Sequence, residues 1–199
     1  MEPWINCLGR RDLKLPWVIC AIGLGVSLFS GSGKAVAERL PEMVTGKAQV
    51  YDGATFGLIQ NDARYRTVTR IRLEAVDACE VRQKARLADV EWPCGAVAAA
   101  WLTSRTLTKE VECRPTRVLS GGGFRAQCYV DGVDIAGLGL GQGMYVLAVP
   151  EHEYPPPGYA EVEARAKAAS AGIWSSEFMM PAQWRRAHGT YNPLAPRRW

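Results

Sequence analysis

The chain has 199 residues, of which 48% are hydrophobic and 22% are charged, an ordinary composition for one globular domain with tails. Its formal net charge is only +4, so bulk charge alone does not indicate a nucleic-acid-binding protein.

Residues 1–37 have the pattern of an export signal. A basic start is followed by an apolar run over residues 15–29 and by the small-x-small sequence Ala35-Val36-Ala37. We predict cleavage after Ala37, a periplasmic or secreted protein, and no stable membrane insertion of the mature chain. The apolar run is short for a membrane-spanning helix, and an uncleaved anchor is the alternative. Cleavage would remove four of the 24 basic and two of the 20 acidic side chains, so the net charge would fall to +2.

The rest of the chain divides into a lead-in over residues 38–46, a domain over residues 47–175 and a C-terminal tail over residues 176–199 that wraps the domain. Apolar alternation predicts five strands, and alanine-rich or amphipathic segments predict three helices. The strands cover residues 48–51, 54–59, 67–76, 109–115 and 124–130, and the helices cover residues 95–103, 134–140 and 159–171. Residues 81–92 are polar and have no regular period. This order predicts an α+β fold that is mainly β, a five-stranded Greek-key barrel of the OB type with about three packed helices.

The third predicted strand ends in a charged turn. Arg72 lies at one of its outward positions, and Asp77 and Glu80 follow its last apolar residue. A guanidinium can bind two phosphate oxygens, one carboxylate can bind a metal ion, and a second carboxylate can take a proton from water. The stretch therefore indicates phosphate chemistry. The alternative is that Arg72 and Glu80 form only a surface ion pair beside a turn.

Four cysteines follow the predicted signal, namely Cys79, Cys94, Cys113 and Cys128. An even number in an exported chain favours two disulfides, for which three pairings are possible. Cys113 and Cys128 both fall in predicted strands, so we predict a cross-strand bridge between them, which leaves Cys79 with Cys94. Zinc is the alternative, but the sequence has no CxxC motif, and spacings of 15, 19 and 15 residues do not resemble a zinc site.

A series of short motifs extends over residues 47–187: Asp52-Gly53-x-Thr55-Phe56, Arg72-Leu73-x-x-Val76-Asp77-Ala78-x-Glu80, Cys94-Gly95, Arg125, Gly132-x-Asp134, Gly172-Ile173-Trp174, Phe178, Pro181 and Trp184-Arg185-Arg186. Their order and spacing resemble the thermonuclease (staphylococcal-nuclease-like) family. The tail resembles that of exported bacterial members of this family.

The resemblance implies an exported, monomeric OB-fold endonuclease that hydrolyses phosphodiester bonds of DNA or RNA with calcium. Arg72 would contact the scissile phosphate, Glu80 would act as general base, and Arg125 would be the second phosphate-binding arginine. Asp77 would be a calcium ligand, with the backbone carbonyl of Ala78 beside it. Guanidinium groups suit the charge on a five-coordinate phosphorus, and calcium prefers oxygen ligands.

Three departures from the family pattern bear on catalysis. Ala54 stands where the family has a second calcium-binding Asp, so we expect weakened calcium use. Cys79 replaces a proline before Glu80, and a disulfide to Cys94 would supply comparable rigidity. Residues 121–124, Gly-Gly-Gly-Phe, replace a segment that carries an acid and a tyrosine before the family's arginine.

These departures leave two alternative functions open. One is a non-catalytic OB-fold module that binds a polyanion or a protein, and the other is an accessory protein of succinoglycan or other exopolysaccharide biosynthesis. The arginine pair Arg185-Arg186 could contact phosphate, but the sequence favours its interpretation as part of a solvated tail.

Overall fold

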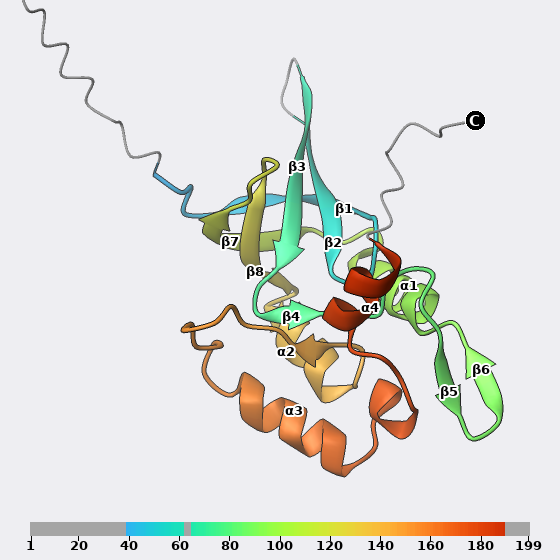
Figure 1. Ribbon diagram of the computed structural model, residues 1–199. Coiled ribbons are helices and arrows are strands. Elements are labelled where there is room, and N and C mark those ends of the chain that lie inside the picture. The colour runs from blue at the N-terminus through green and yellow to red at the C-terminus, as the bar shows by residue number, and fades with distance from the viewer. Residues whose placement is uncertain (1–38, 62–64, 190–199) are drawn as a thin grey trace, which may run out of the picture. The chain divides into compact units, whose positions relative to one another are not determined.

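The computed structural model describes residues 39–61 and 65–189 (Figure 1). The chain divides into two units, residues 1–37 and residues 38–199, and every described residue belongs to the second unit. The predicted signal peptide, its cleavage site after Ala37 and the tail beyond residue 189 therefore lie outside the described residues. None of the helices formed by residues 39–61 and 65–189 has the length and hydropathy of a membrane-spanning segment.

The described residues form strands, α-helices and one short 3-10 helix. The strands are β1 (Val44–Val50), β2 (Thr55–Asn61), β3 (Arg66–Leu73), β4 (Val76–Asp77), β5 (Ala85–Leu87), β6 (Val90–Trp92), β7 (Val111–Val118), β8 (Phe124–Val130), β9 (Val133–Asp134) and β10 (Val146–Leu147). The helices are α1 (Cys94–Thr106), α2 (Ile135–Gly141), α3 (Tyr159–Ala168), the 3-10 helix η1 (Gly172–Ser175) and α4 (Pro181–His188).

Five of the strands form a closed barrel. Hydrogen bonding runs in the order β3-β2-β1-β7-β8 between antiparallel neighbours, and a parallel pairing of β3 with β8 closes the barrel. Helices α2 and α3 pack together below the barrel in Figure 1, and α4 lies beside β4. This architecture confirms the predicted α+β class with an OB-type barrel, although four α-helices, not about three, accompany it within the described residues.

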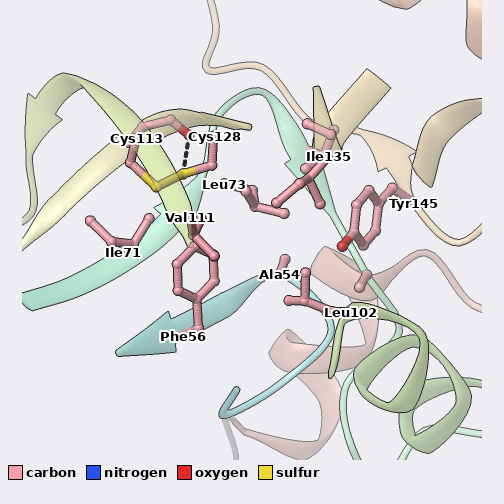
Figure 2. Close-up of a cluster of buried hydrophobic side chains, with 14 of the residues drawn as sticks. Ala54, Phe56, Ile71, Leu73, Leu102, Val111, Cys113, Cys128, Ile135 and Tyr145 are labelled. Atoms are coloured by element: carbon pink, nitrogen blue, oxygen red, sulfur yellow. Dashed lines mark hydrogen bonds between the residues drawn. A yellow bond between two sulfur atoms is a disulfide. The ribbon is translucent and has the colours of Figure 1, made fainter. Parts of the chain in front are cut away.

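Alternation along the strands places one set of side chains inside the barrel. Phe56 of β2 and Ile71 and Leu73 of β3 are completely buried, and Figure 2 shows them packed together with Val111 of β7. Burial of each such side chain stabilises the fold by roughly 1.5–3 kcal/mol. Because Ile71 and Leu73 point into this core, Arg72 between them must project from the outer surface.

The third strand is shorter than predicted. The prediction extended it to Val76, but β3 ends at Leu73, and a turn at Glu74 and Ala75 separates it from β4. Ala75 has a left-handed backbone with a φ of 57°, a conformation that costs a non-glycine residue roughly 1–2 kcal/mol. Its carbonyl accepts a hydrogen bond from the N–H of Ala148 at 2.8 Å. The turn redirects the chain so that β4 pairs with β10 outside the barrel.

Residues 81–92 contain a hairpin that the sequence pattern did not predict. Strands β5 and β6 have three residues each and pair around a turn at Ala88, which has a φ of 51°. Arg86 of β5 also exchanges backbone hydrogen bonds of 2.9 and 2.8 Å with Glu177. Strands this short show no sequence period, and the second partner of β5 comes from the far end of the chain. The hairpin thus holds the beginning of the C-terminal segment.

The two predicted cysteine pairs both lie at bonding distance. Cys113 and Cys128 are directly paired residues of β7 and β8, with their Cα atoms 4.1 Å apart. Cys79 and Cys94 have Cα atoms 5.8 Å apart and connect the turn that carries Glu80 to the first residue of α1. Because these four sulfur atoms are paired, they provide no thiolate for the zinc alternative.

Candidate functional site

Three neighbouring strands carry a row of polar side chains on the outer surface of the barrel. Arg72 of β3 is directly opposite Thr55 of β2 on one side and Arg125 of β8 on the other. Directly opposite residues of paired strands project from the same face of the sheet. The parallel closure of the barrel therefore places the two predicted arginines next to each other, although they are far apart in the sequence.

The glycine loop before Arg125 allows β8 to approach β3 closely. Gly123 has a φ of 83°, and a Cβ atom at this position would lie 2.1 Å from the carbonyl oxygen of Arg70. The N–H of Leu119 donates to the carbonyl of Gly123 at 3.0 Å, and the N–H of Gly122 donates to the carbonyl of Leu119 at 3.0 Å. The segment that departs from the family pattern is thus a hydrogen-bonded turn against β3, and it supports the position of Arg125.

Asp77 is the most highly connected carboxylate of the site. Its side chain is only 5% exposed, and its Oδ1 accepts hydrogen bonds from Nη2 of Arg72 at 2.9 Å and from the N–H of Ala78 at 3.1 Å. The predicted neighbours Arg72, Asp77 and Ala78 are therefore in contact. The observed contact of Ala78 is made by its N–H, whereas the resemblance implied a role for its carbonyl.

Arg185 also binds this carboxylate, which the sequence interpretation did not anticipate. Its Nη1 donates to Oδ1 of Asp77 at 3.0 Å and to Oε1 of Glu80 at 2.8 Å, and its Nη2 donates to Oδ2 of Asp77 at 2.6 Å. The side chain is 24% exposed, so its interpretation as part of a solvated tail was wrong. Hydrogen bonds to Asp77 raise the pKa of Arg185 above its ordinary value, despite the opposing effect of partial burial, so the guanidinium stays charged.

The backbone around the tail explains why Arg185 reaches the site. Pro181, the first residue of α4, is buried, and Arg185 lies one helical turn later on the same face. The amide nitrogen of Gln83 donates to the carbonyl of Met179 at 2.5 Å, just before the helix. Together with the backbone pairing of the tail to β5, these contacts fix the start of α4 against the acidic turn.

Glu80 pairs through its carboxylate with Arg185 of the C-terminal segment and not with Arg72. It is 9% exposed, its backbone N–H donates to Oε1 of Gln83 at 3.1 Å, and its carboxylate accepts the hydrogen bond from Arg185. No ion pair joins it to Arg72 among the described residues, so the predicted alternative of an Arg72–Glu80 surface pair was wrong. The structure brings Glu80 next to Asp77, with the Arg185 guanidinium between their carboxylates.

A cavity of about 360 Å³ lies over this cluster. The charged side chains that line it are those of Arg72, Asp77, Arg125 and Arg185. Its apolar wall is formed by residues 146–150, which comprise β10 and the start of the following loop. Glu80 does not line the cavity. Three of the four predicted catalytic and metal-binding side chains thus meet at one cavity, and the fourth is linked to them through Arg185.

Arg125 differs from the other two arginines of the cavity. Arg72 and Arg185 are both paired with Asp77, whereas no described residue forms an ion pair or a hydrogen bond with the guanidinium of Arg125. Its Nε atom is buried and lacks a hydrogen-bond partner, as does the buried hydroxyl of Thr55 in the same row. An unpaired buried donor is costly, so a polar ligand at this position would stabilise the site.

The residues present do not fit the predicted calcium site. Calcium takes about six to eight oxygen ligands, but both carboxylate oxygens of Asp77 already accept hydrogen bonds from guanidinium groups. Ala54 is 1% exposed within the hydrophobic core, where Figure 2 shows it, and it offers no ligand. In residues 39–61 and 65–189, no three His, Cys, Asp or Glu side chains are grouped so that they could hold a metal ion.

The charges of the site leave a positive excess. Three guanidinium groups surround two carboxylates, so one positive charge has no counter-charge within the cluster. An anion with several oxygen atoms is the ligand that such an arrangement suits chemically.

No protein-family model matches the chain, and no curated protein matches it either.

Proposed function

We propose that the protein binds a phosphodiester group of single-stranded DNA or RNA in the cavity lined by Arg72 and Arg125. The observation that carries this proposal is the unpaired guanidinium of Arg125 beside Arg72. A charged group that is partly removed from water without a counter-ion favours a bound anion. Two adjacent guanidinium forks can each donate two hydrogen bonds to phosphate oxygens.

The surroundings of the two arginines favour a phosphodiester over a small inorganic anion. The wall over residues 146–150 is apolar and suits the sugar or base attached to a phosphate. Arg66, Arg70 and Arg72 lie at outward positions of β3, and successive outward positions of a strand are about 7 Å apart. Arg66 and Arg70 do not line the cavity, but together with Arg72 they form a row of guanidinium groups along one face of β3. A row of positive charges that can follow the nucleic-acid backbone is typical of single-strand binding.

Replacement of Arg125 with glutamine should weaken binding of a fluorescently labelled single-stranded oligonucleotide about tenfold or more. One charge-assisted hydrogen-bonding partner contributes roughly 1.5–3 kcal/mol, and its loss should also reduce the salt dependence of binding by about one phosphate contact. Fluorescence anisotropy over a range of salt concentrations measures both effects. Arg165→Gln is the matched control, because it removes the same charge from an exposed position on α3. Equal losses in the two variants would contradict the proposal, as would absence of binding by the wild-type protein.

Hydrolysis of the bound phosphodiester is the second candidate function. It is favoured by the convergence of Arg72, Asp77 and Arg125 on one cavity, with Glu80 next to Asp77. In this reaction the oxygen of water attacks phosphorus and Glu80 takes a proton from that water. The bond from phosphorus to the leaving oxygen breaks, its electron pair stays on that oxygen, and a proton from solvent completes the leaving alcohol. Glu80 must exchange its hydrogen bond with Arg185 for one with water before it can act as this base.

For this second function, Glu80→Gln should lower the rate of oligonucleotide cleavage at least about 100-fold and leave oligonucleotide binding unchanged. Gel analysis of cleavage products, with a panel of divalent ions and with chelator, provides the measurement. Glu151→Gln, at a side chain that is 90% exposed, is the control for the loss of a carboxylate. Wild-type protein that cuts no faster than Glu80→Gln under every condition would leave binding as the function.

A further inference from the structure

We infer that Arg185 is the resident cation of the acidic turn, and that its guanidinium takes the position between Asp77 and Glu80 that a divalent metal ion would need. The site is therefore complete without a metal ion. This inference concerns the cation bound by the two carboxylates, and it does not depend on whether the cavity binds nucleic acid.

The first argument is the position of a single nitrogen atom. Nη1 of Arg185 lies 3.0 Å from Oδ1 of Asp77 and 2.8 Å from Oε1 of Glu80, so the two carboxylates converge on one cationic group. A metal ion bound to both carboxylates would occupy this same space. It would also face the guanidinium of Arg72, which is 2.9 Å from Oδ1 of Asp77.

The second argument is the number of hydrogen bonds that Asp77 already accepts. Oδ1 accepts from Arg72, from the N–H of Ala78 and from Arg185, and Oδ2 accepts from Arg185 at 2.6 Å. A carboxylate has about four lone-pair sites, so these contacts use the capacity of Asp77. The neighbouring position 54 is a buried alanine, so it supplies no further oxygen ligand.

The third argument is that Arg185 is held in place by structure on both sides of the site. The carboxylates of Asp77 and Glu80 are 5% and 10% exposed, and Arg185 itself is 24% exposed, unlike a flexible surface pair. Gln83 links the acidic turn to the segment before α4, because its side chain accepts a hydrogen bond from the N–H of Glu80 and donates one to the carbonyl of Met179. Entry of a metal ion would require the start of α4 to separate from the acidic turn.

The inference predicts how removal of the guanidinium should change metal binding. In the wild-type protein, calcium should produce no binding heat in isothermal titration calorimetry and no shift of the melting temperature relative to chelator. In Arg185→Met, which keeps a long side chain without the charge, calcium should raise the melting temperature by about 3 °C, since Oδ2 of Asp77 and Oε1 of Glu80 lose their cation. Arg185→Lys, which keeps a cation, should remain unresponsive to calcium.

Arg186→Met is the matched control, because Arg186 is the exposed neighbour of Arg185 on α4. It should respond to calcium no more than the wild-type protein. Stoichiometric calcium binding by the wild type would overturn the inference, and so would a folded Arg185→Met variant that ignores calcium. Where Arg185→Met does not fold, the wild-type titration decides alone, since absence of binding heat supports the inference and saturable binding contradicts it. Neither readout uses an oligonucleotide, so failure of this inference is distinguishable from failure of the proposed function.

Discussion

Replacement of Asp77 with alanine should lower the free energy of unfolding by about 4 kcal/mol. Breaking a buried ion pair by removal of one partner costs roughly 3–5 kcal/mol, because the remaining charges lose their counter-charge. Asp77 is the common partner of Arg72 and Arg185, and it also accepts a hydrogen bond from the backbone of Ala78. Its loss would leave two partly buried guanidinium groups, and Glu80 would be the one remaining carboxylate of the cluster. Urea unfolding followed by circular dichroism provides the measurement.

The matched control for this variant is Glu91→Ala. Glu91 is 3.0 Å from the ammonium of Lys84, but the two side chains are 53% and 61% exposed. An exposed pair of this kind contributes little to the free energy of unfolding. Similar losses of stability in Asp77→Ala and Glu91→Ala would show that the site is not a coupled, partly buried cluster.

Replacement of Gly95 with alanine should destabilise the protein by about 3 kcal/mol and disturb the acidic turn. A Cβ atom at Gly95 would lie 1.7 Å from the carbonyl oxygen of Glu80 and 2.9 Å from the Cα atom of Val81. Both are backbone atoms, so either α1 or the turn must move, and overpacking of this kind costs roughly 1–3 kcal/mol or more. In the wild-type protein, the close approach of α1 to the turn allows the N–H of Gly95 to donate to the carbonyl of Gln83 at 3.3 Å. Chemical unfolding measures the stability of the variant.

Gly141→Ala in α2 tests whether the effect of Gly95→Ala is steric. Its added Cβ atom would meet only a methyl group of Val162 at 3.3 Å, which a side chain can accommodate. The change in stability should therefore be less than about 1 kcal/mol, the size of the ordinary difference in helix propensity between glycine and alanine. If Gly95→Ala were equally mild, the close approach of α1 to the acidic turn would not be a constraint on the fold.

Much of the fold was predictable because the barrel strands alternate clearly between apolar and polar residues. Residues 124–130 were predicted as a strand with the bounds that β8 has. The break after Leu73 was missed, since no glycine or proline marks the turn and Ala75 adopts its left-handed backbone without a sequence signal. The hairpin of β5 and β6 was missed for a different reason. Its strands are too short to show a sequence period, and β5 also pairs with Glu177, which is far away in the sequence.

The candidate site was predictable only in part. The order of Arg72, Asp77, Glu80 and Arg125 indicated a common site, and the barrel brings these residues together. Nothing in the adjacent pair Arg185-Arg186 distinguishes the partly buried Arg185 from the exposed Arg186 unless their positions on a helix are considered. Proline four residues before Arg185 was the available signal, because a buried first residue of a helix places the residue four positions later on the same face.

The closure of the barrel has a consequence for folding. Arg72 and Arg125 become neighbours only through the parallel pairing of β3 with β8, and the intervening chain includes β4, α1 and β7. Such a long-range pairing requires the loop-closure entropy to be overcome before its contacts contribute, which makes it a slow step in folding. A partly folded chain with an open barrel cannot hold one anion between both arginines. An anion that binds both arginines therefore stabilises the closed barrel relative to every open intermediate.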